Sequence, residues 1–336
     1  MDSVTQVALG AAIGEVTLGR RVGRPALLWG GICGLFPDLD VLVPYANAVK
    51  AFTYHRGPSH SVFVLTVLTP LFVWIIDKAH PHTAEYRRRW YILVFLAFVT
   101  HILLDCLTVY GTQIFWPLPT PPVMWSTIFI VDPVYSIPLF FGVSAALILS
   151  RKRSRGHTVN AVCLALSTLY LLWSLGAKVY VTHLAHTSFN RQGISYQNLL
   201  TIPAPFNTLL WRVLAMDNTG YFEGYYSLLD DTRDVEVKHY PSDSDCLEDI
   251  DHQWSIKRLQ WFTHGFYSVR RVGDDIVITD LRMGMEPAYI FRFKVGKIGK
   301  TNGRRVKAVK PKRVRGQVGW EHLGWVWQRI WTEPKR

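Results

Sequence analysis

The sequence predicts an α+β protein, in which a polytopic bundle of transmembrane helices is followed by a soluble domain that is mainly β. Long apolar runs are confined to residues 1–181 of the 336, and a helix needs about 20 apolar residues to cross a bilayer. The rest of the chain has short alternating runs bounded by Gly, Asp and Pro, which are typical of strands. We therefore expect a helical membrane domain at 1–181 and a soluble domain at 182–336.

Six apolar segments are candidates for membrane spans, and they lie at 3–19, 26–45, 61–76, 90–110, 133–150 and 158–181. The last three are the clearest, while the first is a weaker amphipathic candidate rich in Gly and Ala. The second is apolar but broken, because Pro37 disfavours helix at Phe36 and two aspartates follow at once. We expect it to be a half-helix that ends in a protein-lined cavity.

The net charge is +12, and three basic clusters lie in short loops between these segments. Arginines cluster at 20–24, 86–90 and 151–155, and the positive-inside rule places such loops in the cytoplasm. The opposite ends of the segments and the soluble domain then lie outside the cytoplasm. A further basic stretch at 310–315 is explained as a solvated face, so we expect no nucleic-acid partner. The sequence thus predicts a multi-pass protein of the inner or plasma membrane that contacts the lipid bilayer.

Ionisable residues of the apolar half gather on the predicted extracytoplasmic face. Two of them are four residues apart in HILLD, which places both side chains on one face of a helix. Two aspartates lie in FPDLD, and two histidines lie in HRGPSH, where Gly57 and Pro58 would turn the chain so that both face the same ion. Ionisable residues in membrane segments are costly and commonly mark a functional site. The candidate set is Asp38, Asp40, His55, His60, His101 and Asp105.

Three histidines and three aspartates match the nitrogen and oxygen ligand preference of zinc, manganese or iron. One or two divalent ions are compatible with this set. The spacing of His101 and Asp105 allows both to ligate one cation, or allows the carboxylate to orient the imidazole. Each residue alone has a simpler explanation, such as an interfacial histidine or a capping aspartate. Their common location on one membrane face favours a metal site.

The motifs MDSVTQVALGAAIGE, FPDLD, YHRGPSHS and HILLDCLTVYGTQIFWP resemble, in this order, those of the YdjM-type family of membrane-bound metal-dependent hydrolases. The resemblance implies hydrolysis by a metal-activated water and a distant likeness to zinc-dependent phospholipase C and single-strand nucleases. It also implies that the six candidate residues are ligands. Many members carry histidine at the position of Gln6, so this chain has one imidazole fewer for a second ion.

Our leading hypothesis is an integral membrane, metal-dependent hydrolase that acts on a phosphoester or other ester of a lipid-like substrate. Arg56, between the two histidines of HRGPSH, is then a candidate for binding a phosphate or a developing anion. One alternative is a non-catalytic membrane protein with a structural metal and a partner-binding C-terminal domain. Another is a transporter, which would need polar residues through the full membrane depth, whereas the inward halves of the spans have few.

Overall fold

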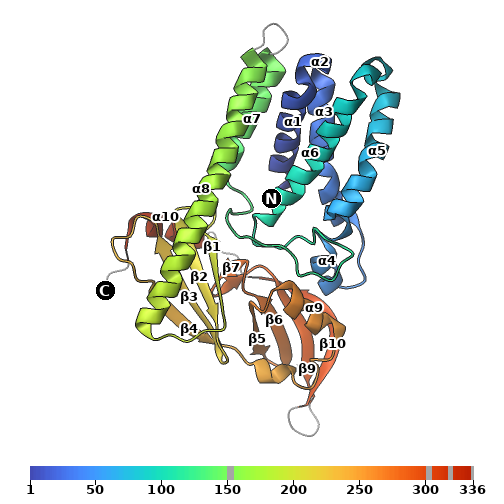
Figure 1. Cartoon of the computed structure of the whole chain (residues 1–336). Coiled ribbons are helices and arrows are strands. Elements are labelled where there is room, and N and C mark those ends of the chain that lie inside the picture. The colour runs from blue at the N-terminus through green and yellow to red at the C-terminus, as the bar shows by residue number, and fades with distance from the viewer. Residues whose placement is uncertain (150–154, 300–304, 317–320, 334–336) are drawn as a thin grey trace. The chain divides into compact units, whose positions relative to one another are not determined.

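The computed structural model describes residues 1–149, 155–299, 305–316 and 321–333 (Figure 1). It confirms the α+β prediction, because helices form the N-terminal half and antiparallel sheets dominate the C-terminal half. The chain divides into two compact units. Unit 1 comprises Met1–Val43 and Arg56–Leu175, and unit 2 comprises Pro44–His55 and Gly176–Arg336.

The helices of unit 1 follow the apolar segments of the sequence. They are α1 (Ser3–Gly14), which continues through a π-helical turn (Glu15–Gly19) into α2 (Arg20–Val22), α3 (Arg24–Leu35), α5 (Val62–Ala79), α6 (Arg87–Cys106), α7 (Pro133–Leu149) and the first part of α8 (Arg155–Gln192). Among the described residues, four helical stretches are long and apolar enough to cross a membrane, namely Arg24–Leu42, Val62–Ala79, Pro81–Cys106 and Arg155–Gln192, and α7 is a shorter apolar helix. Of the basic loop expected at 151–155, residues 151–154 lie outside the described ranges.

Helices α1 and α3 pack through glycines that leave no room for a side chain. A Cβ atom on Gly10 would lie 2.2 Å from the carbonyl oxygen of Gly30, and one on Gly30 would lie 2.2 Å from the carbonyl oxygen of Gly10. Gly14 and Gly34 extend the same contact in both directions. Small residues of this kind let helix backbones approach closely inside membranes. The contact fixes the start of α1 beside the end of α3, where the candidate site lies.

The broken segment at 26–45 ends its α-helix before Pro37. Helix α3 stops at Leu35 and a 3-10 helix, Phe36–Leu42, continues the chain. This tighter turn carries both Asp38 and Asp40, which are 7% and 8% exposed. The break expected from the proline therefore turns two carboxylates into the protein interior instead of leaving them along a lipid-facing helix.

Unit 2 contains two four-stranded antiparallel sheets (Figure 1). The first has the order β1 (Asn198–Pro203), β2 (Leu210–Met216), β3 (Gly220–Ser227) and β4 (Val237–Pro241). The second has the order β10 (Val306–Val314), β9 (Arg292–Ile298), β6 (Asp275–Asp280) and β5 (Tyr267–Val272). The unit also contains a small hairpin of β7 (Gly284–Met285) and β8 (Ala288–Tyr289), the second part of α8, and the helices α4 (Ala48–Tyr54), α9 (Trp254–Phe262) and α10 (Glu321–Trp331).

Helix α4 belongs to unit 2 although it lies in sequence between two apolar segments of unit 1. Its Phe52 is 5% exposed and packs against the rings of Phe262, Phe291 and Phe293, at centroid distances of 4.8, 4.5 and 5.2 Å. Arg258 donates to the carbonyl oxygen of Thr53 at 3.3 Å. The core of unit 2 thus includes a segment that the sequence assigns to the membrane domain.

A buried ion pair joins two strands of the first sheet. Arg212 on β2 donates to Glu223 on β3 at 2.7 Å, and both side chains are at most 5% exposed. Burial by itself raises the pKa of the Glu223 carboxyl, but the Arg212 guanidinium and hydrogen bonds from Tyr289 and Tyr225 outweigh it, so that the pKa is lowered. The charged pair is therefore stable inside the unit at neutral pH, and its contribution is lost as the pH falls below the usual range for glutamate.

We expect Glu223→Ala to destabilise unit 2 by about 3–5 kcal/mol, because it leaves the buried Arg212 without a counter-charge. Asp234→Ala is the matched control, since the Arg191–Asp234 pair is 51% and 47% exposed and contributes at most about 1 kcal/mol. Urea unfolding of the full chain in detergent, followed by tryptophan fluorescence, measures both. Equal midpoints for the two variants would contradict the assignment of Glu223 to a buried pair.

Candidate metal centre

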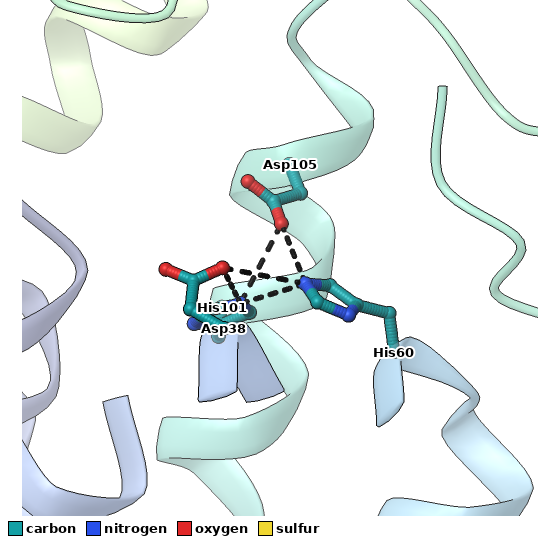
Figure 2. Close-up of side chains that lie close together, drawn as sticks. All are labelled: Asp38, His60, His101 and Asp105. Atoms are coloured by element: carbon teal, nitrogen blue, oxygen red, sulfur yellow. Dashed lines mark hydrogen bonds and ion pairs between the residues drawn. The ribbon is translucent and has the colours of Figure 1, made fainter. Parts of the chain in front are cut away.

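Four side chains from three segments of unit 1 converge at one point (Figure 2). Asp38 comes from the 3-10 helix after α3, His60 from the short 3-10 turn Pro58–His60, and His101 and Asp105 from one face of α6. All four are buried, and His60, His101 and Asp105 are 0% exposed. One ligand atom from each residue lies within 4.8 Å of the others.

The distances between these atoms fit a single small cation. The two Nε2 atoms of His60 and His101 are 3.2 Å apart, and they lie 3.1 and 3.5 Å from Oδ2 of Asp105. Oδ1 of Asp38 is 3.6 Å from each Nε2. Tetrahedral zinc with bonds of about 2.0–2.1 Å separates its donor atoms by about 3.3 Å. The group has the size of such a ligand set.

Hydrogen bonds on the far side of each imidazole fix its tautomer. Nδ1 of His101 lies 2.7 Å from the carbonyl oxygen of Gly34, which can only accept, so Nδ1 carries the proton and Nε2 carries a lone pair. Nδ1 of His60 lies 2.9 Å from Oγ of Ser59, which itself donates to Asp40 at 2.7 Å, so here too Nδ1 is the donor. Backbone carbonyls and carboxylate-linked groups hold metal-binding histidines in this way.

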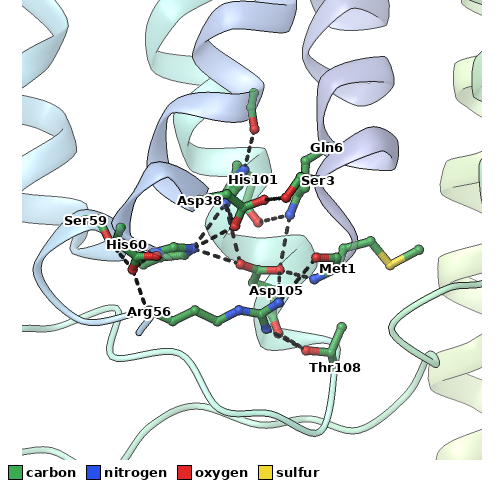
Figure 3. A network of polar contacts seen from close by, with 12 residues as sticks. Met1, Ser3, Gln6, Asp38, Arg56, Ser59, His60, His101, Asp105 and Thr108 are labelled. Atoms are coloured by element: carbon green, nitrogen blue, oxygen red, sulfur yellow. Dashed lines mark hydrogen bonds and ion pairs between the residues drawn. The ribbon is translucent and has the colours of Figure 1, made fainter. Parts of the chain in front are cut away.

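Asp105 presents one oxygen to the group and has the other held by donors (Figure 3). Oδ1 accepts from Gln6 Nε2 at 3.2 Å, pairs with Arg56 Nη2 at 3.0 Å and contacts the amino group of Met1. Oδ2 is buried, and among the described residues it faces the Nε2 atoms of His60 and His101 at 3.1 and 3.5 Å. Two imidazole lone pairs and two carboxylate oxygens therefore face one another, and a divalent cation is the partner that such an acceptor set matches.

The structure brings together four of the six residues expected as ligands. Asp40 lies beside them, where its Oδ2 accepts from Ser59 and from the backbone N–H of Arg56 at 2.9 Å and is 3.6 Å from Nδ1 of His60. This places Asp40 behind the imidazole of His60. His55 ends α4 and belongs to unit 2, outside the four-residue group. Metal ligation by Asp40 and His55 stays a prediction.

Arg56 is 4% exposed and already engaged by the site. Its Nη1 donates to the hydroxyl of Thr108 at 3.0 Å, its Nη2 pairs with Asp105, and its guanidinium lies 5.1 Å from the centre of the Tyr110 ring. Its φ of +60° is a conformation that side-chain-bearing residues rarely adopt, so the turn before His60 holds it in place. Its role in binding an anion stays a prediction.

Three further residues contact the site, and of these the sequence pointed only to Gln6. Gln6 is fully buried and donates to both Asp105 and the carbonyl oxygen of His101, each at 3.2 Å. Ser3, one turn earlier on α1, donates to Oδ2 of Asp38 at 2.6 Å, and Ser59 orients His60. A sequence signal for Ser3 is that it lies three residues before Gln6 at the start of a helix, which places both on one face.

Another contact between ionisable side chains lies at the far end of α1. Glu15 is 2% exposed and pairs with His157 of α8, although the sequence suggested that the inward halves of the spans have few polar residues. Between Glu15 and the metal-site end of α1, the buried side chains are Ala8, Leu9, Ala11, Ala12 and Ile13. The polar groups at the two ends of α1 are thus separated by an apolar stretch of that helix.

Comparison with known proteins places the chain in a family. The sequence profile described as YdjM inner membrane protein matches residues 1–181, which is more than half of the chain and includes all four residues of the group. The chain belongs to the YdjM family of inner membrane proteins. The YdjM resemblance stated from the motifs is thereby confirmed, as is the expectation of an inner membrane protein.

One curated relative is similar to part of this YdjM-family chain. It is the Bacillus subtilis (strain 168) protein described as "Uncharacterized protein YfhP", which is 29% identical over 140 residues. The match covers 40% of this chain and 42% of that protein, so the chain spans less than half the length of this relative. No solved structure matches the chain.

Proposed function

We propose that this chain is a metal-dependent hydrolase of the inner membrane that acts on a phosphoester or other ester of a lipid-like substrate. Asp38, His60, His101 and Asp105 would hold one divalent ion. The observation that carries the proposal is the convergence of four buried acceptor atoms whose imidazoles are oriented from behind. Mixed imidazole and carboxylate donors favour zinc, and manganese and iron accept the same donors.

A zinc ion bound here would lower the pKa of a coordinated water to about 7 and so supply a nucleophile for hydrolysis. The residues of the chain prepare the site for that role. Gly34 and Ser59 fix the two imidazoles, and Arg56 and Gln6 fix Asp105 with one oxygen directed inward. With a divalent ion bound, the ion and the guanidinium of Arg56 would be two cationic groups in one site, which favours an anionic phosphoester.

The site would lie on the extracytoplasmic side of the membrane. Support comes from the basic loops, which the positive-inside rule places in the cytoplasm, and from the position of the ligands. Asp38 follows the C-terminal end of α3, His101 and Asp105 lie in the last turns of α6, and His60 precedes α5. A reporter fused after Tyr180 should be active outside the cytoplasm, and a cytoplasmic reporter would overturn this orientation.

Hydrolysis is tested with the purified full chain in lipid nanodiscs. Lipid analogues with a phosphodiester, a phosphomonoester or an acyl ester are offered in separate reactions, with zinc or manganese added. We expect one class to be hydrolysed, with a loss of at least about a hundredfold in His60→Ala and no loss in the exposed control His82→Ala. A metal-loaded chain that hydrolyses none of the three classes would overturn the proposal.

We expect Arg56→Lys to lower kcat about tenfold while the metal content stays that of wild type, because lysine keeps the charge but cannot reach Asp105 and Thr108 together. Metal analysis and steady-state kinetics on one preparation measure the two quantities. An increase in KM alone would assign Arg56 to substrate binding, as the sequence suggests. Unchanged kinetics would contradict both roles.

A structural metal without catalysis is the second candidate, and one observation favours it. Four protein donors suffice to fill a tetrahedral zinc site, and closed sites of this kind are typically structural. In that case the ion would hold together the segment after α3, helix α6 and the turn before α5. The C-terminal unit would then bind a partner. Inorganic phosphate distinguishes the two, since it changes the coordination of an open site and leaves a closed one unaltered.

A further inference from the structure

Exposed apolar side chains of unit 2 are concentrated at one end of its first sheet. At this end β1 stops at Pro203, β2 begins at Leu210 and β3 stops at Ser227, and the register pairs Leu210 with Ser227. Among the described residues of unit 2, all the large exposed apolar side chains except Trp254 and Val272 lie on the elements that meet here. They are Val179, Tyr180, Phe206, Leu229, Trp325, Trp327 and Trp331.

Helix α10 is fixed to this end of the sheet by its backbone and its buried face (Figure 1). The hydroxyl of Ser227 donates to the carbonyl oxygen of Ile330 at 2.8 Å. Val326 and Ile330 are 5% and 2% exposed and pack with Ala204 and Leu210. The position of α10 is therefore set by contacts within unit 2.

The other side of α10 carries two tryptophans that nothing in the described chain covers. Trp327 and Trp331 are one helical turn apart, 63% and 61% exposed, with ring centroids 5.9 Å from each other. Exposing such large apolar surfaces to water is unfavourable by about 25 cal/mol for each Å². Tryptophan is enriched where one side of a protein meets the headgroup layer of a membrane, because its ring is apolar and its N–H can remain hydrated.

The chain leaves its apolar span at the same end of the sheet. Lys178 donates to the carbonyl oxygen of Thr201, and Thr182 bonds the Thr201 hydroxyl at 2.7 Å, so the 178–182 part of α8 lies along the last residues of β1. Helix α8 has 38 residues, or about 57 Å at 1.5 Å per residue, which exceeds the roughly 30 Å hydrocarbon core. Its exposed Val179 and Tyr180 continue the apolar surface of the span into unit 2.

We propose that this end of unit 2 rests in the interfacial layer of the lipid bilayer, with Trp327 and Trp331 of α10 inserted among the headgroups. The occupant of the surface is lipid, because the surface is continuous with the exposed apolar face of a membrane-spanning helix and its largest members are tryptophans. The inference concerns the soluble unit and does not depend on the proposed hydrolysis. It makes α10 a second attachment of unit 2 to the membrane, beside α8.

Nitroxide depth measurements on the full chain in phospholipid nanodiscs test the proposal. Trp327→Cys and Trp331→Cys are labelled in a Cys246→Ser background, because the three other cysteines are buried. Val272→Cys, 50% exposed on the hairpin of β5 and β6, is the matched control. Collision of the label with oxygen, which concentrates in lipid, is compared with collision with a water-soluble nickel chelate.

We expect oxygen to be favoured over the nickel chelate at 327 and 331 and the ratio to reverse at 272. Preference for the nickel chelate at all three positions would place α10 in water and overturn the proposal. Protection from both reagents, with dipolar broadening between labels, would show that a second copy of the chain covers the surface, which would equally overturn it. The readout is the location of each label, so it does not depend on catalytic activity.

Discussion

His101→Ala should abolish the divalent metal of the purified full chain, while wild type retains about one ion per chain. His101 supplies one of four donor atoms, its Nε2 lies 3.2–3.6 Å from the other three residues' nearest donors, and its other nitrogen is fixed by Gly34. Its removal leaves two carboxylates and one imidazole, a set that binds borderline cations far more weakly. Elemental analysis by mass spectrometry after dialysis measures the content.

The control for this loss is His82→Ala, which removes an exposed histidine just before the start of α6, whereas His101 lies near the end of that helix. Asp38→Asn is a second test, because it keeps the size of the side chain and the oxygen that Ser3 contacts while removing the charge. We expect metal to be retained in His82→Ala and reduced in Asp38→Asn. Metal retained in His101→Ala at the level of the control would contradict the four-residue site.

The second large effect is expected for Gly30→Ala. The new methyl group would lie 2.2 Å from the carbonyl oxygen of Gly10, which belongs to the backbone and cannot rotate away. Helices α1 and α3 must then separate, at a cost of about 1–3 kcal/mol or more for overpacking. Because Ser3 and Gln6 on α1 contact Asp38 and Asp105, we expect both the melting temperature and the metal affinity to fall.

Gly176→Ala is the matched control for Gly30→Ala. Gly176 is also a glycine within a helix, but a Cβ atom there meets no atom within 4 Å. Alanine favours helix over glycine by about 1 kcal/mol, so this variant should be as stable as wild type or slightly more stable. Thermal unfolding in detergent compares the two. Equal melting temperatures would show that the α1–α3 contact does not hold unit 1 together.

The fold class could be predicted because the length of an apolar run is a direct consequence of bilayer thickness. The break at Pro37 could also be predicted, since proline restricts the residue before it whatever the tertiary structure. The location of α4 in unit 2 could not be predicted from the sequence. It depends on Phe52, which packs among three phenylalanines that are more than 200 residues away in sequence. The local sequence around Phe52 does not predict such a distant contact.

Part of the candidate site could be predicted from residue spacing and from the order of the apolar segments. His101 and Asp105 share a helix face by their spacing, and the topology brings the ends of three segments together. The spacing in HRGPSH predicts that His55 and His60 act together; the structure brings His60 into the four-residue group, and ligation by His55 stays a prediction. Ser59 and Gln6 orient the site through hydrogen bonds, and these depend on tertiary contacts that the local sequence does not show.

Zinc-edge X-ray absorption of the full chain, recorded with and without inorganic phosphate, tests most directly the claim that Asp38, His60, His101 and Asp105 hold a catalytic ion. We expect a shell of imidazole nitrogens and carboxylate oxygens, without sulfur, that changes when phosphate is added. A shell containing sulfur or lacking imidazole would place the ion elsewhere. A shell of these four residues that phosphate leaves unaltered would contradict a catalytic role for the ion.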